Sequence, residues 1–145
     1  MEQRKQMMYE MDNLLRTVFK QIRYEINSLL ENELSRNEFL ILNLLREQGA
    51  KKVTEFASIL GVSASHITAV TDTLVEKGWI TRIRSKEDRR IIKIHLTDKG
   101  KEITEHFEKK KTEYFMERFE SFDDEELKTM IKLFKKLDKS QKDKA

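Results

Sequence analysis

Apolar residues recur at intervals of three and four over much of the chain, which is the spacing of an amphipathic α-helix. The pattern predicts a first helix over residues 8–31 and a second, apolar nearly all round, over residues 36–48. Because apolar side chains on every face need cover on every face, we expect the second helix to lie at the centre of the core. Ser35 and Glu38 have capping-box spacing at its start.

Two shorter helices are predicted next, over about residues 53–60 and 63–77, with Gly61 between them and Gly78 after the second. Ser63 has the chemistry of an N-cap for the second helix. Two helices joined by a tight glycine turn indicate a helix-turn-helix, whose second helix is the recognition helix. The residues expected to face the core are Phe56, Ala57, Ile59 and Leu60 in the first helix and Ile67, Val70 and Leu74 in the second.

The apolar period then shortens to two over residues 80–96, which predicts two β-strands joined by a polar tip at residues 85–89. A two-stranded ribbon is marginal on its own, so we expect this wing to lean on the helices. The predicted fold class is mostly α with a small β wing, a winged helix-turn-helix flanked by N- and C-terminal dimerisation helices.

Two amphipathic helices complete the pattern, one from a cap at Thr97 to about Phe119 and one from a cap at Asp123 to about Ser140. The short middle segment is too small to cover the apolar stripes of the first helix and the last two. We therefore expect an intertwined homodimer; the alternative is that these helices pack only on their own chain. The predicted organisation is an N-terminal helix at 1–34, a DNA-binding lobe at 35–100 and C-terminal dimerisation helices at 101–145.

The charge of the chain is concentrated in one segment. The 145 residues carry a net charge of only +3, yet residues 81–101 hold eight basic and three acidic groups. Positive charge gathered on one element is typical of a surface that binds nucleic-acid phosphate, although it is also compatible with a basic solvated face. The wing therefore becomes the expected electrostatic contact to DNA.

Composition excludes several other classes. The chain has no cysteine, which rules out disulfide scaffolds and thiol-based sensing. Its longest apolar stretch, residues 39–45, is too short for a membrane span, and residues 1–10 show no apolar signal-peptide core. We expect a cytoplasmic protein with no membrane partner and no cofactor. No catalytic motif is present, so an enzyme is not expected.

Several short motifs occur together in one order and spacing. They are Gly61-Val62-Ser63, Leu74 to Ile80 (LVEKGWI), Asp88-Arg89-Arg90 and Leu96-Thr97-Asp98-Lys99-Gly100. This set resembles the MarR (multiple antibiotic resistance regulator) family of bacterial transcription factors, and the resemblance covers nearly the whole chain. It implies a dimeric winged-helix repressor or activator that binds double-stranded DNA at a pseudo-palindromic operator. Members of this family often release DNA when a small ligand binds between the dimer region and the DNA-binding lobe.

Candidate base contacts lie at the start of the recognition helix, the part that reaches base edges in a helix-turn-helix. They are Ser63, Ser65, His66 and Thr68, with Ala69 able to touch a thymine methyl group. The alternative for Ser63 is that it only caps the helix. Many members of the resembled family carry arginine near position 69, so alanine here predicts modest direct readout and greater dependence on the wing and DNA shape.

The wing supplies the candidate backbone and minor-groove contacts. These are Arg84, Lys86, Arg89, Arg90 and Lys93. By resemblance, Asp88 is structural and holds the wing arginines, and Arg90 matches the family's Asp-x-Arg arginine. Lys86 and Lys93 are more typical of phosphate contacts, which position a protein without specifying sequence. The alternative for Arg90 is an ion pair with Asp88 that only supports the fold.

Three alternatives stay open at this stage. Glu102 and His106 stand four apart on one helix face, a spacing that is able to hold a metal but is more typical of a solvated pair. The helices could serve a protein-binding module with incidental DNA affinity, or an architectural protein without sequence preference. An effector pocket is implied by the resemblance. Its candidate lining residues are Phe19, Ile22, Tyr24 and Met116, although residues of these types more often form plain core.

Overall fold

A computed structural model describes residues 1–30 and 33–140 of the chain. Its elements follow the order α1 (Glu2–Leu29), α2 (Arg36–Gln48), α3 (Val53–Leu60), α4 (Ala64–Glu76), β1 (Ile80–Arg84), β2 (Ile92–Leu96), α5 (Asp98–Arg118) and α6 (Asp124–Leu137). This confirms a mostly α chain with a small β wing. Residue 31, where the first helix was expected to end, and the last five residues of the predicted region 101–145 lie outside the described residues.

The chain divides into two compact units, Met1–Lys111 and Thr112–Ala145, with the boundary inside α5. In the first unit, α2 is the central helix, as expected. Its side chains Ile41 and Leu42 are completely buried. The capping box is present, since Ser35 Oγ accepts from the Glu38 backbone N–H and a Glu38 carboxylate oxygen accepts from the Ser35 backbone N–H.

The helix-turn-helix is formed by α3 and α4. Gly61 ends α3 in the left-handed conformation with φ of 66°, a position that favours glycine. Phe56, Ile67 and Leu74 are completely buried, as the pattern predicts. The prediction for Ile59 was wrong, because this side chain is 50% exposed. The packed face of α3 is shared by Val53, Phe56, Ala57 and Leu60, and Ile59 lies beyond the edge of that face.

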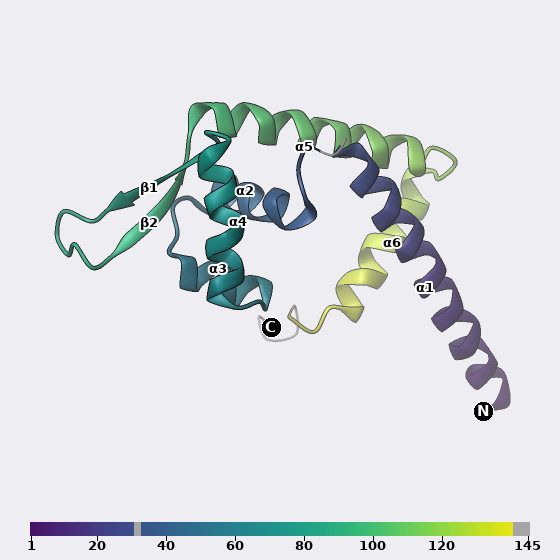
Figure 1. Cartoon of the computed structure of the whole chain (residues 1–145). Helices are drawn as coiled ribbons and strands as arrows, with labels where there is room; N and C mark the ends of the chain where they lie inside the picture. Colours follow the sequence, from purple (N-terminus) through teal and green to yellow (C-terminus); the bar gives the residue numbers. More distant parts are fainter. Residues whose placement is uncertain (31–32, 141–145) are drawn as a thin grey trace. The chain divides into compact units, whose positions relative to one another are not determined.

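The wing is an antiparallel ribbon in which Ile80 pairs with Leu96 and Arg84 with Ile92. It extends beyond the helix-turn-helix at one end of the unit (Figure 1). Its base leans on the helices, as expected, because Ile80 and Ile94 are buried in the core. The pattern gave no sign of one further attachment: Lys51 forms an isolated bridge with Ile94, with reciprocal backbone hydrogen bonds of 3.2 and 2.7 Å.

The start of α5 is fixed against the end of the recognition helix. Thr97 Oγ1 accepts from the Gly100 backbone N–H at 3.0 Å and donates to the Gly78 carbonyl at 2.7 Å. A Cβ atom at Gly100 would lie 2.0 Å from the Trp79 carbonyl oxygen, so only glycine fits there. Close packing against the Trp79 backbone thus explains why the sequence motif ends in glycine at position 100.

The first helix is longer than the pattern predicts. It begins at Glu2 rather than at residue 8, because its first turns consist of good helix formers that carry no apolar stripe. No residue of α1 is buried in the single chain. Its large exposed apolar side chains are Met7, Met8, Tyr9, Met11, Leu14, Val18, Phe19 and Tyr24.

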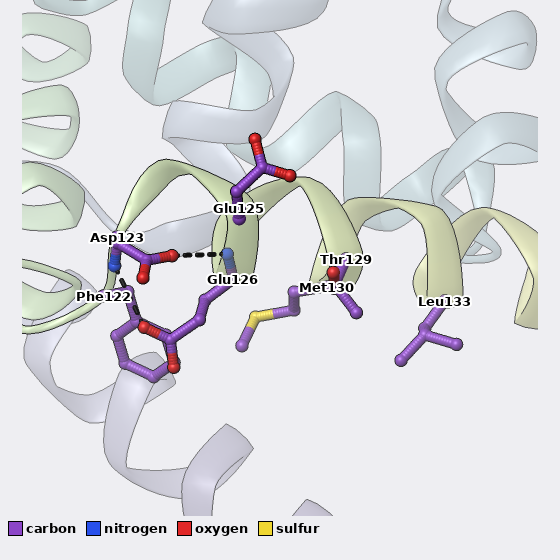
Figure 2. A pocket seen from close by; sticks show the side chains of 7 residues that line it. All are labelled: Phe122, Asp123, Glu125, Glu126, Thr129, Met130 and Leu133. Atoms are coloured by element: carbon purple, nitrogen blue, oxygen red, sulfur yellow. Dashed lines mark hydrogen bonds between the residues drawn. The ribbon is translucent and has the colours of Figure 1, made fainter.

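The second unit holds the end of α5 and the helix α6. Asp123 and Glu126 form the expected capping box, with reciprocal hydrogen bonds of 2.8 and 3.1 Å (Figure 2). The predicted end of this helix at about Ser140 was three residues too late, because Asp138 is extended and its carboxylate accepts from the Ser140 N–H. No residue of α6 is buried, and its exposed apolar side chains are Ile131, Leu133, Phe134 and Leu137.

Candidate nucleic-acid interface

The N-terminal turn of α4 places three of the predicted contacts side by side. Ser63 Oγ accepts from the His66 backbone N–H at 3.1 Å, so Ser63 does cap the helix. The Ser63 and Ser65 hydroxyl groups are hydrogen-bonded at 3.1 Å. His66 Nε2 is hydrogen-bonded to the Asn37 side-chain amide at 2.9 Å. Asn37 was not among the sequence candidates, because no local pattern indicates that the first turn of α2 reaches the recognition helix.

The remaining candidates on α4 also lie on its exposed face. Thr68 and Ala69 are both exposed. Thr68 Oγ1 donates to the Ala64 carbonyl at 3.0 Å, which fixes its rotamer and leaves the oxygen free to accept. The five candidates Ser63, Ser65, His66, Thr68 and Ala69 are all solvent-accessible. They therefore form a polar, uncharged surface on the first half of the recognition helix.

One cation reaches the recognition helix from the wing. Arg82 in β1 forms an ion pair with Asp72 of α4, and its Nη2 atom donates to Thr71 Oγ1 at 3.1 Å. Thr71 is completely buried. Arg82 was not among the sequence candidates, because no local pattern indicates that β1 crosses α4 at Asp72. The wing and the recognition helix are thus joined by side chains as well as by the chain.

The wing tip is organised around Asp88. Arg90 donates from Nε and Nη2 to the two Asp88 carboxylate oxygens at 3.1 and 3.2 Å, and the Arg90 backbone N–H donates to Oδ1 at 3.0 Å. These hydrogen bonds hold the pKa of Asp88 below its ordinary value. Ser85 Oγ closes the turn by accepting from the Asp88 N–H. The ion pair between Asp88 and Arg90 is therefore present.

That ion pair leaves most of the Arg90 side chain accessible to a further partner. Its side chain is 91% exposed, and a guanidinium has five N–H donors, of which this pair uses two. The other basic residues of the wing differ in their surroundings. Arg84 donates to the Arg89 backbone carbonyl and so braces the tip. Lys86 and Arg89 are exposed and make no side-chain hydrogen bond or ion pair with the residues that the structure describes.

Lys93 lies in β2 opposite Ile83, one residue from the tip end of the ribbon, and is exposed. Glu55 in α3 accepts from the Lys52 backbone N–H at 3.1 Å. That hydrogen bond lowers the pKa of Glu55, and Lys51, Lys52 and Lys93 add to the effect through their positive charge. Lys93 is thus part of a small basic cluster beside β2.

The far end of the recognition helix is anchored to α2. Lys77 Nζ donates to the Glu38 carboxylate and to the Glu33 carbonyl, each at 2.9 Å. It also lies 4.9 Å from the centre of the Trp79 ring. Glu38 is nearly buried, and its other carboxylate oxygen completes the capping box of α2. One carboxylate therefore fixes both the start of α2 and the end of α4.

A pocket of about 290 Å³ lies between α1, α2 and the first part of α5. Phe19 and Ile22 line it, whereas Tyr24 and Met116, 74% and 73% exposed, do not. Arg23, Arg36 and Lys111 also line it. Asn43 Oδ1 is buried there without a hydrogen-bond partner among the described residues.

Within residues 1–30 and 33–140, no three His, Cys, Asp or Glu residues are grouped so as to hold a metal ion. His106, the possible partner of Glu102, packs its ring against Phe107 with 5.3 Å between ring centres. Over the same residues no single helix is long and apolar enough to cross a membrane, and α3 and α4 pass that test only together, across a bend of 115°.

A helix-turn-helix whose recognition helix exposes polar side chains on its first half, followed by an arginine- and lysine-rich antiparallel wing, defines a winged helix-turn-helix protein. The profile of the MarR family matches residues 34–92. The "Uncharacterized HTH-type transcriptional regulator YpoP" of Bacillus subtilis (strain 168) is 68% identical over 97% of this chain and 100% of that relative. The chain belongs to the MarR family and is an HTH-type transcriptional regulator.

Two further comparisons agree with this assignment. The "HTH-type transcriptional repressor MdtR" of Bacillus subtilis (strain 168) is 30% identical over 69% of this chain and 65% of that relative. The structure of a MarR family protein from Bacillus stearothermophilus superimposes with a TM-score of 0.84 at 25% identity. That match covers 92% of this chain and 94% of the other. The relatives are transcriptional regulators rather than enzymes.

Proposed function

We propose that two copies of this chain bind a pseudo-palindromic operator in the cytoplasm and repress transcription from it. The observation that carries the proposal is the pairing of an exposed, polar first half of the recognition helix with a basic wing that Arg82 fixes to that helix. Recognition helices of a dimer enter successive major grooves about 34 Å apart. The wings then lie at the neighbouring minor grooves, where arginine is attracted by the negative potential of A·T-rich DNA.

The roles of the individual residues follow from their surroundings. Ser65, His66 and Thr68 offer hydroxyl and imidazole groups to base edges, Ala69 offers a methyl group, and Ser63 adds a phosphate or base contact to its capping role. In the wing, Arg90 and Arg89 reach the minor groove, while Lys86 and Lys93 meet phosphates. Asp88 sets the orientation of Arg90, and Arg84 acts mainly by bracing the tip.

Dimerisation through the terminal regions, residues 1–34 and 101–145, is supported by apolar side chains that the single chain leaves exposed. The helix α6 buries no residue of its own, and a groove of about 420 Å³ runs along it between Phe122, Met130 and Leu133 (Figure 2). The helix α1 likewise buries none. Apolar faces of this extent are typical of an obligate interface.

The test is a selection of duplexes from a random-sequence library by the full-length protein, followed by competition with unselected DNA. We expect selected duplexes to contain two inverted half-sites about one helical turn apart. They should bind at least about 1,000-fold more tightly than random duplexes at physiological salt. Equal affinity for both would instead mean an architectural protein, and no affinity at all would mean a protein-binding module.

Release by a small ligand is proposed for the pocket between α1, α2 and α5. Three cations line it, and the buried Asn43 Oδ1 needs a hydrogen-bond donor. A small anion that also carries a hydroxyl group would satisfy both requirements. We expect 4-hydroxybenzoate, at millimolar concentration, to raise the melting temperature and weaken operator binding, with neutral benzyl alcohol as the matched control. If both compounds act equally or neither acts, this pocket is not the effector site.

A further inference from the structure

The recognition helix carries negative charge where it would face DNA. The helix α4 contains no lysine or arginine, and Asp72 lies one turn after Thr68 on the same exposed face. The Asp72 side chain is 60% exposed. An unpaired carboxylate at this position would repel the phosphates on either side of a major groove.

Arg82 is placed to cancel that charge. Its guanidinium bonds to the Asp72 carboxylate and to Thr71 Oγ1, and Thr71 Oγ1 donates in turn to the Thr68 carbonyl at 3.0 Å. Because Thr71 is completely buried, this chain of hydrogen bonds fixes the guanidinium against the helix. The Arg82 side chain is 34% exposed, against 91% for Arg90, so Arg82 is held inward while Arg90 extends outward.

We infer that Arg82 is a positioning residue whose task in DNA binding is to neutralise Asp72, so that the face of α4 from Ser65 to Asp72 approaches the phosphates without net charge. This inference rests on the proposed DNA-binding function. The wing therefore makes its own contacts with DNA and also supplies the recognition helix with a counter-ion, Arg82. No base contact takes the place of the arginine that the helix lacks at position 69. Instead, the negative charge of Asp72 is neutralised.

The test compares affinities of the full-length variants for one duplex of about 30 base pairs, selected by the wild-type protein from a random library. Arg82→Gln should weaken binding at least about tenfold, because it exposes the Asp72 charge to phosphate. Asp72→Asn alone should bind at least as tightly as the wild type. The double variant should recover to within about threefold of the wild type, since it has no charge left to cancel.

Two controls separate charge from structure. Arg82→Lys keeps the charge and should stay within about threefold of the wild type, and it serves as the decisive variant if Arg82→Gln does not fold. Lys20→Gln removes an exposed charge from α1 and should leave affinity unchanged. Far-ultraviolet circular dichroism and thermal melting check the fold of each variant.

Three results would overturn the inference: wild-type affinity in folded Arg82→Gln, a folded double variant as weak as Arg82→Gln, or Arg82→Lys as weak as Arg82→Gln. The second would make Arg82 a direct DNA contact, and the third would make its hydrogen-bond geometry, rather than its charge, the requirement. Failure of the wild-type protein to bind any duplex is a different outcome, which refutes the proposed function itself.

Discussion

At the scale of single residues, the most constrained positions are those at which the surrounding atoms allow only one type of side chain. Gly100 faces the Trp79 carbonyl at a distance that no Cβ atom tolerates. Asp88 accepts three hydrogen bonds from Arg90, one from its backbone and two from its guanidinium. Both positions were identified in the sequence only through the family resemblance, since neither spacing nor composition explains them. The structure supplies the physical reason in each case.

Substitution Gly100→Ala should lower the free energy of unfolding by at least about 1–3 kcal/mol, because the added methyl group forces the start of α5 away from the turn after α4. Urea unfolding followed by circular dichroism measures the change. The exposed neighbour Lys99→Ala is the matched control and should shift stability by less than about 0.5 kcal/mol. An unchanged unfolding midpoint in Gly100→Ala would contradict the close contact.

The wing tip should depend on pH through Asp88. Its pKa is held below the ordinary value of 3.8 by hydrogen bonds from Arg90. A depressed pKa in the folded state means that the contribution to stability is present above 3.8 and is lost as pH falls through the lower, folded value. NMR titration of the Asp88 carboxyl and the Arg90 amide should show this transition, and Asp88→Asn should abolish it. A transition at or above 3.8 would contradict the pairing.

At the scale of elements, the sequence predicts those features that are determined by residues close together in the chain. The bounds of α2 and α3 and the presence of a two-stranded wing follow from apolar spacing, glycine stops and caps. The pairs His66–Asn37 and Arg82–Asp72 could not be predicted, because each joins two elements whose crossing no local pattern records. The length of the first helix was underestimated, because its first turns carry helix propensity without an apolar stripe.

The junction of α2 and α4 depends on the pair Glu38–Lys77. Lys77→Met should destabilise the chain by about 1–3 kcal/mol, because Glu38 then stays nearly buried without its cation. A double-mutant cycle with Glu38→Gln, measured by urea unfolding, isolates the interaction. The ion pair predicts a coupling energy clearly above zero. Strictly additive losses would mean that the two residues act independently.

At the scale of the whole molecule, the chain leaves the apolar side chains of α1 and α6 exposed. The proposed dimer covers them and places two recognition helices on one face of the DNA. Phe134→Glu in α6 should produce a monomer by sedimentation velocity while circular dichroism shows its helices intact. The exposed Lys132→Glu, which also adds negative charge to α6, should remain dimeric. A wild-type protein that is monomeric at micromolar concentration would contradict the dimer.

The most direct test of the account is the salt dependence of operator binding, because the central claim makes the basic wing the element that contacts phosphates and the minor groove. The logarithm of the binding constant should fall steeply with the logarithm of salt concentration, by about 0.9 for each phosphate contact. Arg90→Ala should weaken binding strongly and flatten the slope by about 1.8 per dimer, because each wing loses one cation that displaces a counterion from the DNA. A binding constant that ignores both salt and Arg90 would contradict the wing as the DNA-binding element.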